Sequence, residues 1–126
     1  MKFCSLYSGS SGNSIFVGSE KAKILIDAGL PGKKIDEALK YIGQNPSDID
    51  GIFITHEHID HIKGVGVLSR KYDIPIYAPH DTWVAMESTI GKIKEHNIKP
   101  IRQKHRSVRC LYLDLHIPRN VQNLLL

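Results

Sequence analysis

Residues 51–64 read GIFITHEHIDHIKG, in which a short apolar run leads directly into three histidines, one aspartate and one glutamate. The apolar run at residues 51–55 is typical of a buried strand. In open α/β sheets, functional sites are usually built where strands end at their carboxyl edge. The sequence therefore predicts a strand that delivers a cluster of metal-binding side chains to the edge of a sheet.

The order of residues in the cluster favours metal binding. His56 and His58 stand two apart, so an extended or turning segment can present both imidazoles to one ion, and Asp60 and His61 can address a second ion nearby. Imidazole and carboxylate together suit zinc, manganese or iron. The HExxH motif of metalloproteases is excluded because Asp60 occupies the position four residues after His56. A solvated polar loop is the alternative, but its place directly after an apolar strand favours the metal site.

The rest of the chain predicts an α/β fold. Apolar runs separated by turn residues, and apolar residues at helical spacing, predict strands first and then alternating helices and strands. Strands are expected at residues 2–7, 14–17, 22–27, 51–55 and 74–78, the first three antiparallel. Helices are expected over residues 30–43, over residues 62–72, and after Asp81, which would cap the third.

Composition adds limits on the class of protein. The chain has 126 residues, enough for one domain, and an apolar fraction of 41%. We expect no membrane span and no signal peptide, because no apolar run is long enough. Cys4 and Cys110 are too few for a disulfide framework, which indicates a reducing, cytoplasmic compartment.

The charge is distributed unevenly. Residues 1–98 carry a net charge of −1, and the last 28 residues carry +5, which together make the formal charge of +4. A basic chain often binds nucleic acid, but here the main body is not basic, so the charge says little about partners. We therefore expect a body at residues 1–98 and a divergent basic tail at residues 99–126, either frame-shifted or disordered.

The HxHxDH motif after a short strand resembles that of the metallo-β-lactamase superfamily. The stretches SLYSGSSGNS, ILIDAGL, THEHIDHIKGVGVLSRKY, IPIYA and TWVAMESTIGKI are similar to its YycJ/WalJ-type branch, over residues 3–98. The resemblance implies the N-terminal half of an αββα sandwich, a mixed sheet with helices on one face. It also implies a hydrolase of phosphodiester bonds, a DNA exonuclease in its intact form.

The resemblance further implies a two-metal site. Two ions of zinc or manganese, with iron as a further candidate, would be bound by His56 and His58 (first ion) and by Asp60 and His61 (second ion), Asp60 being also catalytic. In such sites the ions lower the pKa of a bridging water, so that hydroxide attacks phosphorus. Asp27 would hold the segment THEHIDH at residues 55–61, called the histidine loop below, through hydrogen bonds. SGSSGNS at residues 8–14 lacks the lysine of a P-loop and is better interpreted as a turn between strands. In the resembled family this loop lies near the metal site, which implies that Asn13 contacts the substrate.

The sequence departs from the family after residue 98. Relatives continue for about as long again and supply a later histidine, a bridging aspartate and a last histidine. His105 and His116 are present here, but their surroundings do not match. We therefore expect a truncated or frame-shifted N-terminal half, with weak metal binding, little hydrolysis, and association through an exposed apolar sheet face.

Two alternatives stay open. The first is another hydrolase of the superfamily, acting on thioesters, lactones or RNA, because HxHxDH is common to all of them. The second is a catalytically inactive fragment that binds metal or a partner.

Overall fold

The computed structural model describes residues 2–101. The prediction of a tail at residues 99–126 therefore falls almost wholly outside the described residues, as do His105 and His116. The strands are β1 (Lys2–Tyr7), β2 (Ser14–Gly18), β3 (Lys23–Ile26), β4 (Gly51–Phe53), β5 (Ile76–Pro79) and β6 (Ile98–Ile101). The helices are α1 (Gly32–Tyr41), α2 (Ile59–Ile62), α3 (Val65–Tyr72) and α4 (His80–Ile90), with 3-10 turns at Pro46–Asp48 and Glu95–Asn97.

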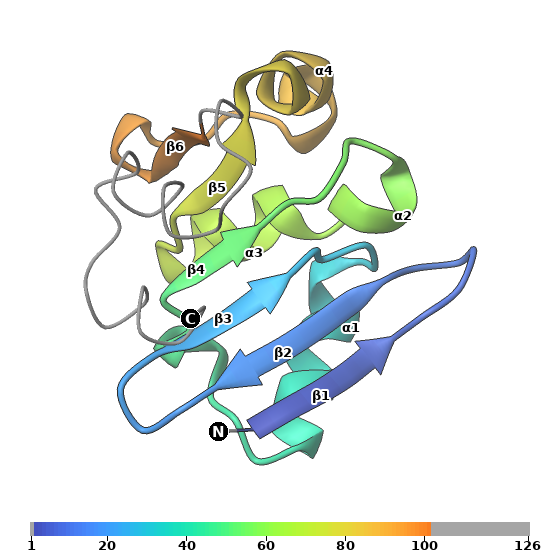
Figure 1. Cartoon of the computed structure of the whole chain (residues 1–126), viewed down its shortest axis with the longest axis vertical. Coiled ribbons are helices and arrows are strands. Elements are labelled where there is room, and N and C mark those ends of the chain that lie inside the picture. Colours follow the sequence, from blue (N-terminus) through green and yellow to red (C-terminus); the bar gives the residue numbers. More distant parts are fainter. Residues whose placement is uncertain (1, 102–126) are drawn as a thin grey trace.

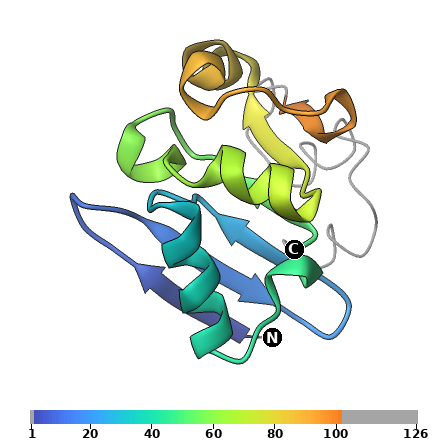
Figure 2. The ribbon, with the colours of Figure 1, turned by 180° about the vertical axis from the view of Figure 1, so that it is seen from behind.

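The strands form one mixed sheet whose spatial order follows the sequence from β1 to β6 (Figure 1). β1 pairs with β2 and β2 with β3 in antiparallel fashion, whereas β3, β4, β5 and β6 run parallel. Parallel neighbours need a long crossover, which a helix supplies here at each step. The crossover helices cover one face of the sheet (Figure 2). The predicted fold class, with antiparallel strands first, is confirmed.

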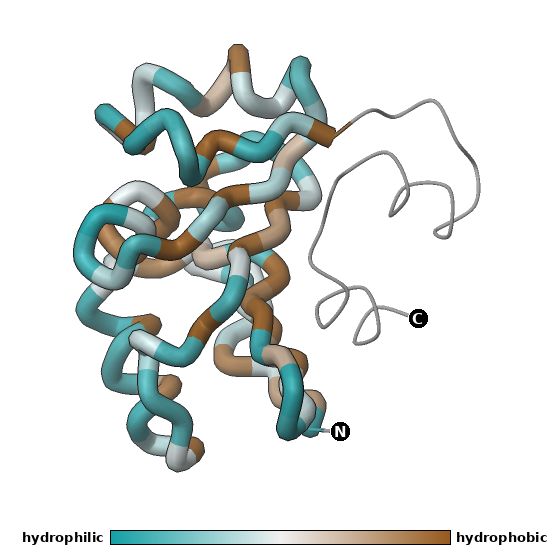
Figure 3. The backbone as a smooth tube through the Cα atoms, turned by 90° about the vertical axis from the view of Figure 1, so that its left-hand side faces the viewer, coloured by the Kyte–Doolittle hydropathy of each residue, from teal (hydrophilic) through white to brown (hydrophobic). Residues whose placement is uncertain are grey.

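Strand alternation builds the core between sheet and helices. Successive side chains in a strand point to opposite faces, so Leu25 packs under the helices while its neighbour Ile24 points away. Figure 3, in which the backbone is coloured by hydropathy, shows apolar segments in the middle of the molecule and hydrophilic segments mainly toward its outside. The largest fully buried side chains are Phe16, Ile24, Leu25, Ile35, Leu39, Ile52, Ile62, Leu68, Ile74, Ile76, Met86 and Val65.

The face of the sheet away from the helices carries a second apolar cluster. Its centre is Val17, Ile24 and Tyr77, all at most 8% exposed. The ring of Tyr77 stacks on Phe53, with centroids 4.6 Å apart, which covers apolar surface of both. The expected exposed apolar face is thus buried at its centre and half-buried at its rim.

Three local expectations differ from the structure. The helix expected over residues 62–72 is broken into α2 and α3 around Gly64, whose backbone lies against Leu30 so closely that a Cβ would stand 2.3 Å from that carbonyl oxygen. Asp81 does not cap α4, which begins one residue earlier without a side-chain cap. β6 continues the sheet through residues 99–101, which were expected to belong to the divergent tail.

None of the helices within residues 2–101 combines the length and the apolar character that crossing a bilayer requires.

Asp36 ties α1 to α3. Its carboxylate accepts hydrogen bonds from Tyr72 Oη at 2.6 Å and from Lys71 Nζ at 3.0 Å. Lys40, one turn along α1, lies 3.2 Å from the other oxygen. Burial raises the pKa of Asp36, but the hydrogen bonds from Tyr72 and the two lysines outweigh burial, and the pKa falls below its usual value of 3.8.

Helix α4 offers a matched test of the core. Met86 is fully buried and Val84, on the same helix, is 63% exposed. Truncating Met86→Ala leaves a cavity and is expected to lower the free energy of unfolding by about 2–5 kcal/mol. Val84→Ala is expected to change it by less than about 0.5 kcal/mol. Urea unfolding measures both; similar losses in the two variants would contradict this packing.

The lowered pKa of Asp36 predicts a pH dependence. A carboxyl whose pKa is lower in the folded than in the unfolded state stabilises the fold above the unfolded pKa, and that stability is lost as the pH falls through the folded pKa. Asp36→Asn should therefore destabilise the protein most at about pH 6, and the difference from the parent should shrink below about pH 4. Urea unfolding across this range checks it; a constant difference would count against the ion-pair origin.

Candidate metal centre

The histidine loop and Asp27 meet because their strands are neighbours. β3 and β4 run parallel, with Ile26 paired to Phe53, so both strands end at the same edge of the sheet. The N–H of Asp27 donates to the carbonyl oxygen of Phe53 at 2.8 Å and continues the ladder by one residue. The first residue after β3 therefore stands directly beside the segment that enters the histidine loop.

Asp27 is buried and makes three hydrogen bonds with that loop. One carboxylate oxygen accepts from the backbone N–H of Thr55 at 2.8 Å. The other accepts from Thr55 Oγ1 at 2.6 Å and lies 2.6 Å from Nδ1 of His61. Its backbone is left-handed, with φ of 62°, a conformation that aspartate and asparagine adopt more readily than most residues. The carboxylate thereby joins the start of the histidine loop to its end.

The three imidazoles lie together. The ring centroids of His56 and His61 are 3.8 Å apart, and those of His56 and His58 are 4.7 Å apart. Nδ1 of His61 is engaged by Asp27, which sets the ring orientation and leaves Nε2 on the other side of the ring. Nε2 of His61 lies 3.4 Å from a carboxylate oxygen of Asp60. The structure thus brings together all four of the predicted ligands.

Asn13 joins the turn between β1 and β2 to α2. Its side-chain amide donates to a carboxylate oxygen of Asp60 at 3.0 Å and to the carbonyl oxygen of Gly9 at 2.8 Å. Its backbone N–H donates to the carbonyl oxygen of Asp60 at 2.8 Å, and its own carbonyl accepts from Gly29 at 2.9 Å. Substrate contact stays a prediction for Asn13. The role of Asn13 in positioning Asp60 could not be predicted from local sequence patterns, because the two residues are 47 positions apart.

Gly29 allows the segment after β3 to approach the backbone of Asp60 closely. A Cβ at this position would stand 1.7 Å from the carbonyl oxygen of Asp60, a distance that no side chain tolerates. Beside it, the N–H of Ala28 donates to the carbonyl oxygen of His61 at 2.9 Å. The segment after β3 therefore packs directly on the start of α2, and only glycine fits there.

The donor set suits divalent transition metals. Imidazole nitrogens and a carboxylate are the ligands that zinc and manganese accept, and His61 has the carboxylate partner typical of metal-ligating histidines. Within residues 2–101, no three such side chains already surround a common point as ligands would. The carboxylate of Asp60 accepts a hydrogen bond from Asn13, so the residues fit a metal by chemistry and proximity.

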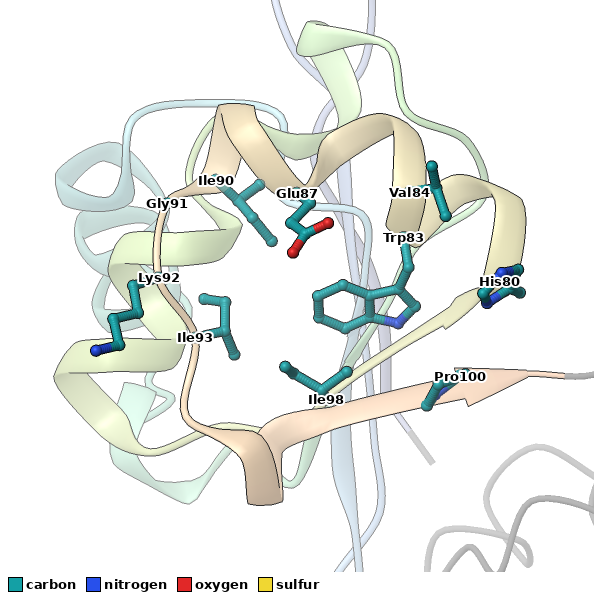
Figure 4. Close-up of a pocket in the computed structure, with 10 residues that line it drawn as sticks. All are labelled: His80, Trp83, Val84, Glu87, Ile90, Gly91, Lys92, Ile93, Ile98 and Pro100. Carbon is teal, nitrogen blue, oxygen red and sulfur yellow. The ribbon is translucent and has the colours of Figure 1, made fainter.

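A mainly apolar hollow lies elsewhere in the molecule. It has a volume of about 510 Å³ between α4 and β6, with the indole of Trp83 at its centre and Glu87 pointing into it (Figure 4). Nε1 of Trp83 is buried without a hydrogen-bond partner among the described residues. The pocket carries no cluster of histidines or carboxylates, so the candidate site remains the histidine loop. His96 is not part of the histidine loop; its Nε2 lies 2.8 Å from a carboxylate oxygen of Asp73.

Known proteins resemble this chain in both sequence and fold. The family profile described as the Metallo-beta-lactamase superfamily matches residues 7–119. Exodeoxyribonuclease YycJ of Bacillus anthracis is 53% identical over 93 residues, which are 74% of this chain and 35% of that protein. Exodeoxyribonuclease WalJ of Streptococcus pneumoniae (strain D39) is 54% identical over 94 residues, 73% of this chain and 35% of that protein.

Among solved structures, the Rm3 metallo-beta-lactamase superposes with a TM-score of 0.61 at 28% identity, covering 74% of this chain and 34% of that one. The chain thus spans about a third of the length of the curated relatives it matches.

Two substitutions of Asp27 separate its hydrogen bonds from its backbone conformation. Asp27→Gly tolerates the left-handed φ but loses all three hydrogen bonds of the carboxylate, so unfolding should become easier by at least about 1–3 kcal/mol. Asp27→Ala also places an ordinary side chain at positive φ, which should add about 1–2 kcal/mol. Urea unfolding of both variants measures this. Equal losses would show that backbone strain at this position contributes nothing.

Proposed function

Because the chain belongs to the metallo-beta-lactamase superfamily, we propose that its histidine loop binds divalent metal and serves the hydrolysis of phosphodiester bonds in DNA. The observation that carries this proposal is the carboxylate of Asp27, which holds His61 and both donors of Thr55 so that three imidazoles and Asp60 gather at one sheet edge. The choice of DNA is supported by the 53–54% identity to proteins named exodeoxyribonucleases.

We assign the metal ligands as His56 and His58 for one ion and Asp60 and His61 for the other. Zinc or manganese is proposed, with iron as a further candidate. Bound ions of this kind act as Lewis acids toward phosphoryl oxygens and lower the pKa of water. The residues of the chain itself position the ligands: Asp27 contacts Nδ1 of His61 and leaves Nε2 on the opposite side of the ring, toward Asp60. Asn13 holds the carboxylate of Asp60 in place.

The number of ligands limits what the chain does alone. Catalytic zinc sites keep three protein ligands for each ion, and the proposed assignment supplies two. The matched part of this chain corresponds to 35% of the length of each of these relatives. We therefore propose weak metal binding and little hydrolysis by this chain, with full activity in a protein of the relatives' length. A cytoplasmic location is proposed from the two cysteines.

The alternative is a metal-binding or interaction fragment without activity. The same ligand shortage favours it, because two ligands bind an ion without completing a catalytic site. A hydrolase of thioesters, lactones or RNA is the other candidate, since the histidine loop itself carries no feature selective for DNA. Hydrolysis of labelled DNA, labelled RNA and a thioester by a full-length relative separates these substrates.

Metal titration of the chain tests the ligand assignment. Zinc or manganese is added to the 126-residue chain and to Asp27→Asn, and binding is followed by isothermal titration calorimetry. Because Asp27 orients His61, the variant should bind about 10–100 times more weakly. The double variant His56→Ala/His58→Ala should lose the first ion.

Glu57→Ala is the matched control, because Glu57 lies between the ligands and is exposed. It should bind like the parent. If Glu57→Ala weakened metal binding as much as His56→Ala/His58→Ala does, the assignment would be contradicted. Full metal occupancy with DNA turnover by the 126-residue chain would contradict the proposed weakness of the isolated chain.

A further inference from the structure

The two edges of the sheet differ in how they are protected from pairing. At one edge, β6 carries Lys99 and Pro100, and a lysine or a proline on an edge strand discourages the addition of another strand. At the other edge, β1 reads KFCSLY, without proline and with Lys2 as its single charge. Within residues 2–101, β1 has a neighbouring strand on one side only. β1 is therefore the edge that remains able to pair.

The ladder of the inner strands shows which backbone groups β1 leaves free. In an antiparallel pair, alternate residues turn their N–H and C=O toward the same neighbour. The N–H of Asp27 donates toward β4, so Ile24 and Ile26 turn toward β2. Their partners in β2, Val17 and Ile15, turn toward β3. Phe16 is left to bond with β1.

Phe16 is paired with Cys4, so the N–H and C=O of Cys4 are directed inward, to β2. Phe3 and Ser5, on either side of it, direct theirs outward. The register is regular from Lys2 to Ser5 and shifts only after Ser5. The free edge therefore offers two successive pairs of backbone donors and acceptors, at Phe3 and at Ser5.

Apolar side chains flank this free edge. Phe3 is 70% exposed, and Tyr41, at the end of α1, is 92% exposed. Between β1 and α1 lies a hollow of about 450 Å³, lined by Cys4, Ser5, Leu6, Tyr7, Glu37, Ala38, Tyr41 and Ile42. Exposed aromatic residues next to a free strand edge are typical of an interaction surface.

We propose that β1 pairs antiparallel with β1 of a second copy of this chain, about a two-fold axis at Cys4. This register lets Phe3 exchange both hydrogen bonds with the partner's Ser5, and Ser5 with the partner's Phe3, so that all four outward groups are used. Cys4 then faces the partner's Cys4 as a pair without hydrogen bonds, with Cα atoms about 4.5 Å apart. The contact is self-complementary, as a two-fold interface requires.

The charges agree with a second copy as the occupant. α1 follows β3 and returns to the start of β4, so it runs opposite to β3 and to β1, and Glu37 lies nearer the Leu6 end of β1 than Tyr41 does. In the antiparallel pair, Lys2 stands opposite the partner's Leu6, on the helix side of the sheet. Each Lys2 thus approaches the partner's Glu37, and the two-fold axis makes this ion pair twice.

Cross-linking through Cys4 tests the register. The 126-residue chain carrying Cys110→Ser is treated with diamide, which takes up the two protons and two electrons released as the thiols join. A Cα separation of about 4.5 Å lies within the range of disulfides. We expect a disulfide-linked dimer of twice 14.2 kDa. The variant Cys4→Ser/Cys110→Ser should give none. Absence of the linked dimer while light scattering shows a dimer would overturn the proposed register.

Variants at Ser5 test the surface itself. Ser5→Pro removes the outward N–H and Ser5→Lys adds an edge charge, and each should raise the dissociation constant by roughly ten- to hundredfold, because the change acts twice. Lys99→Ser, at the opposite edge, is the matched control and should dimerise like the parent. Sedimentation equilibrium measures the constants, and circular dichroism confirms the fold.

Exchanging the charges of Lys2 and Glu37 tests whether the partner of β1 is a second copy of this chain. Lys2→Glu should weaken the dimer, and Lys2→Glu combined with Glu37→Lys should restore it, which only pairing between copies explains. A parent chain that is monomeric at high micromolar concentration, or a dimer unaffected by both Ser5 variants, would overturn the proposal.

Discussion

The carboxylate of Asp27 is the contact on which the site depends. It is 4% exposed and binds both the first and the last parts of the histidine loop, through Thr55 and through His61. A buried carboxylate is costly unless its oxygens accept hydrogen bonds, so the loop and the carboxylate stabilise each other. Asp27 directly follows the central strand β3, so its position is fixed by the sheet. Its hydrogen bonds in turn fix the loop that carries the three imidazoles.

The close packing around Asp27 explains several features that look unrelated in the sequence. Gly29 lets the segment after β3 touch the carbonyl of Asp60, and Gly64 lets the end of α2 touch Leu30. Asn13 then fills the space between the first turn and α2 with hydrogen bonds. At the interruption between α2 and α3, the N–H of Gly64 donates to the carbonyl oxygen of Ala28 at 2.8 Å, so the break is held against the segment after β3.

The mixed sheet also determines which surfaces are available for contacts. Its parallel part places the carboxyl ends of β3 and β4 side by side, which gathers the ligands at one edge. Its antiparallel part ends in β1, an edge strand whose only charge is at its first residue. The proposed metal site and the proposed association thus involve different parts of the same sheet.

Much of this protein was determined by the sequence alone. Strands β1 to β5, α1, the mixed α/β class and the candidate metal ligands among residues 56–61 follow from periodicity and residue type, which act within a few residues along the chain. The tertiary structure decided the rest. The bond between Asp27 and His61 joins residues 34 apart, and that between Asn13 and Asp60 joins residues 47 apart. The break at Gly64 and the strand β6 likewise depend on neighbours distant in sequence. Local patterns carry no information on such contacts, because they form only when separate strands reach the same edge of one sheet.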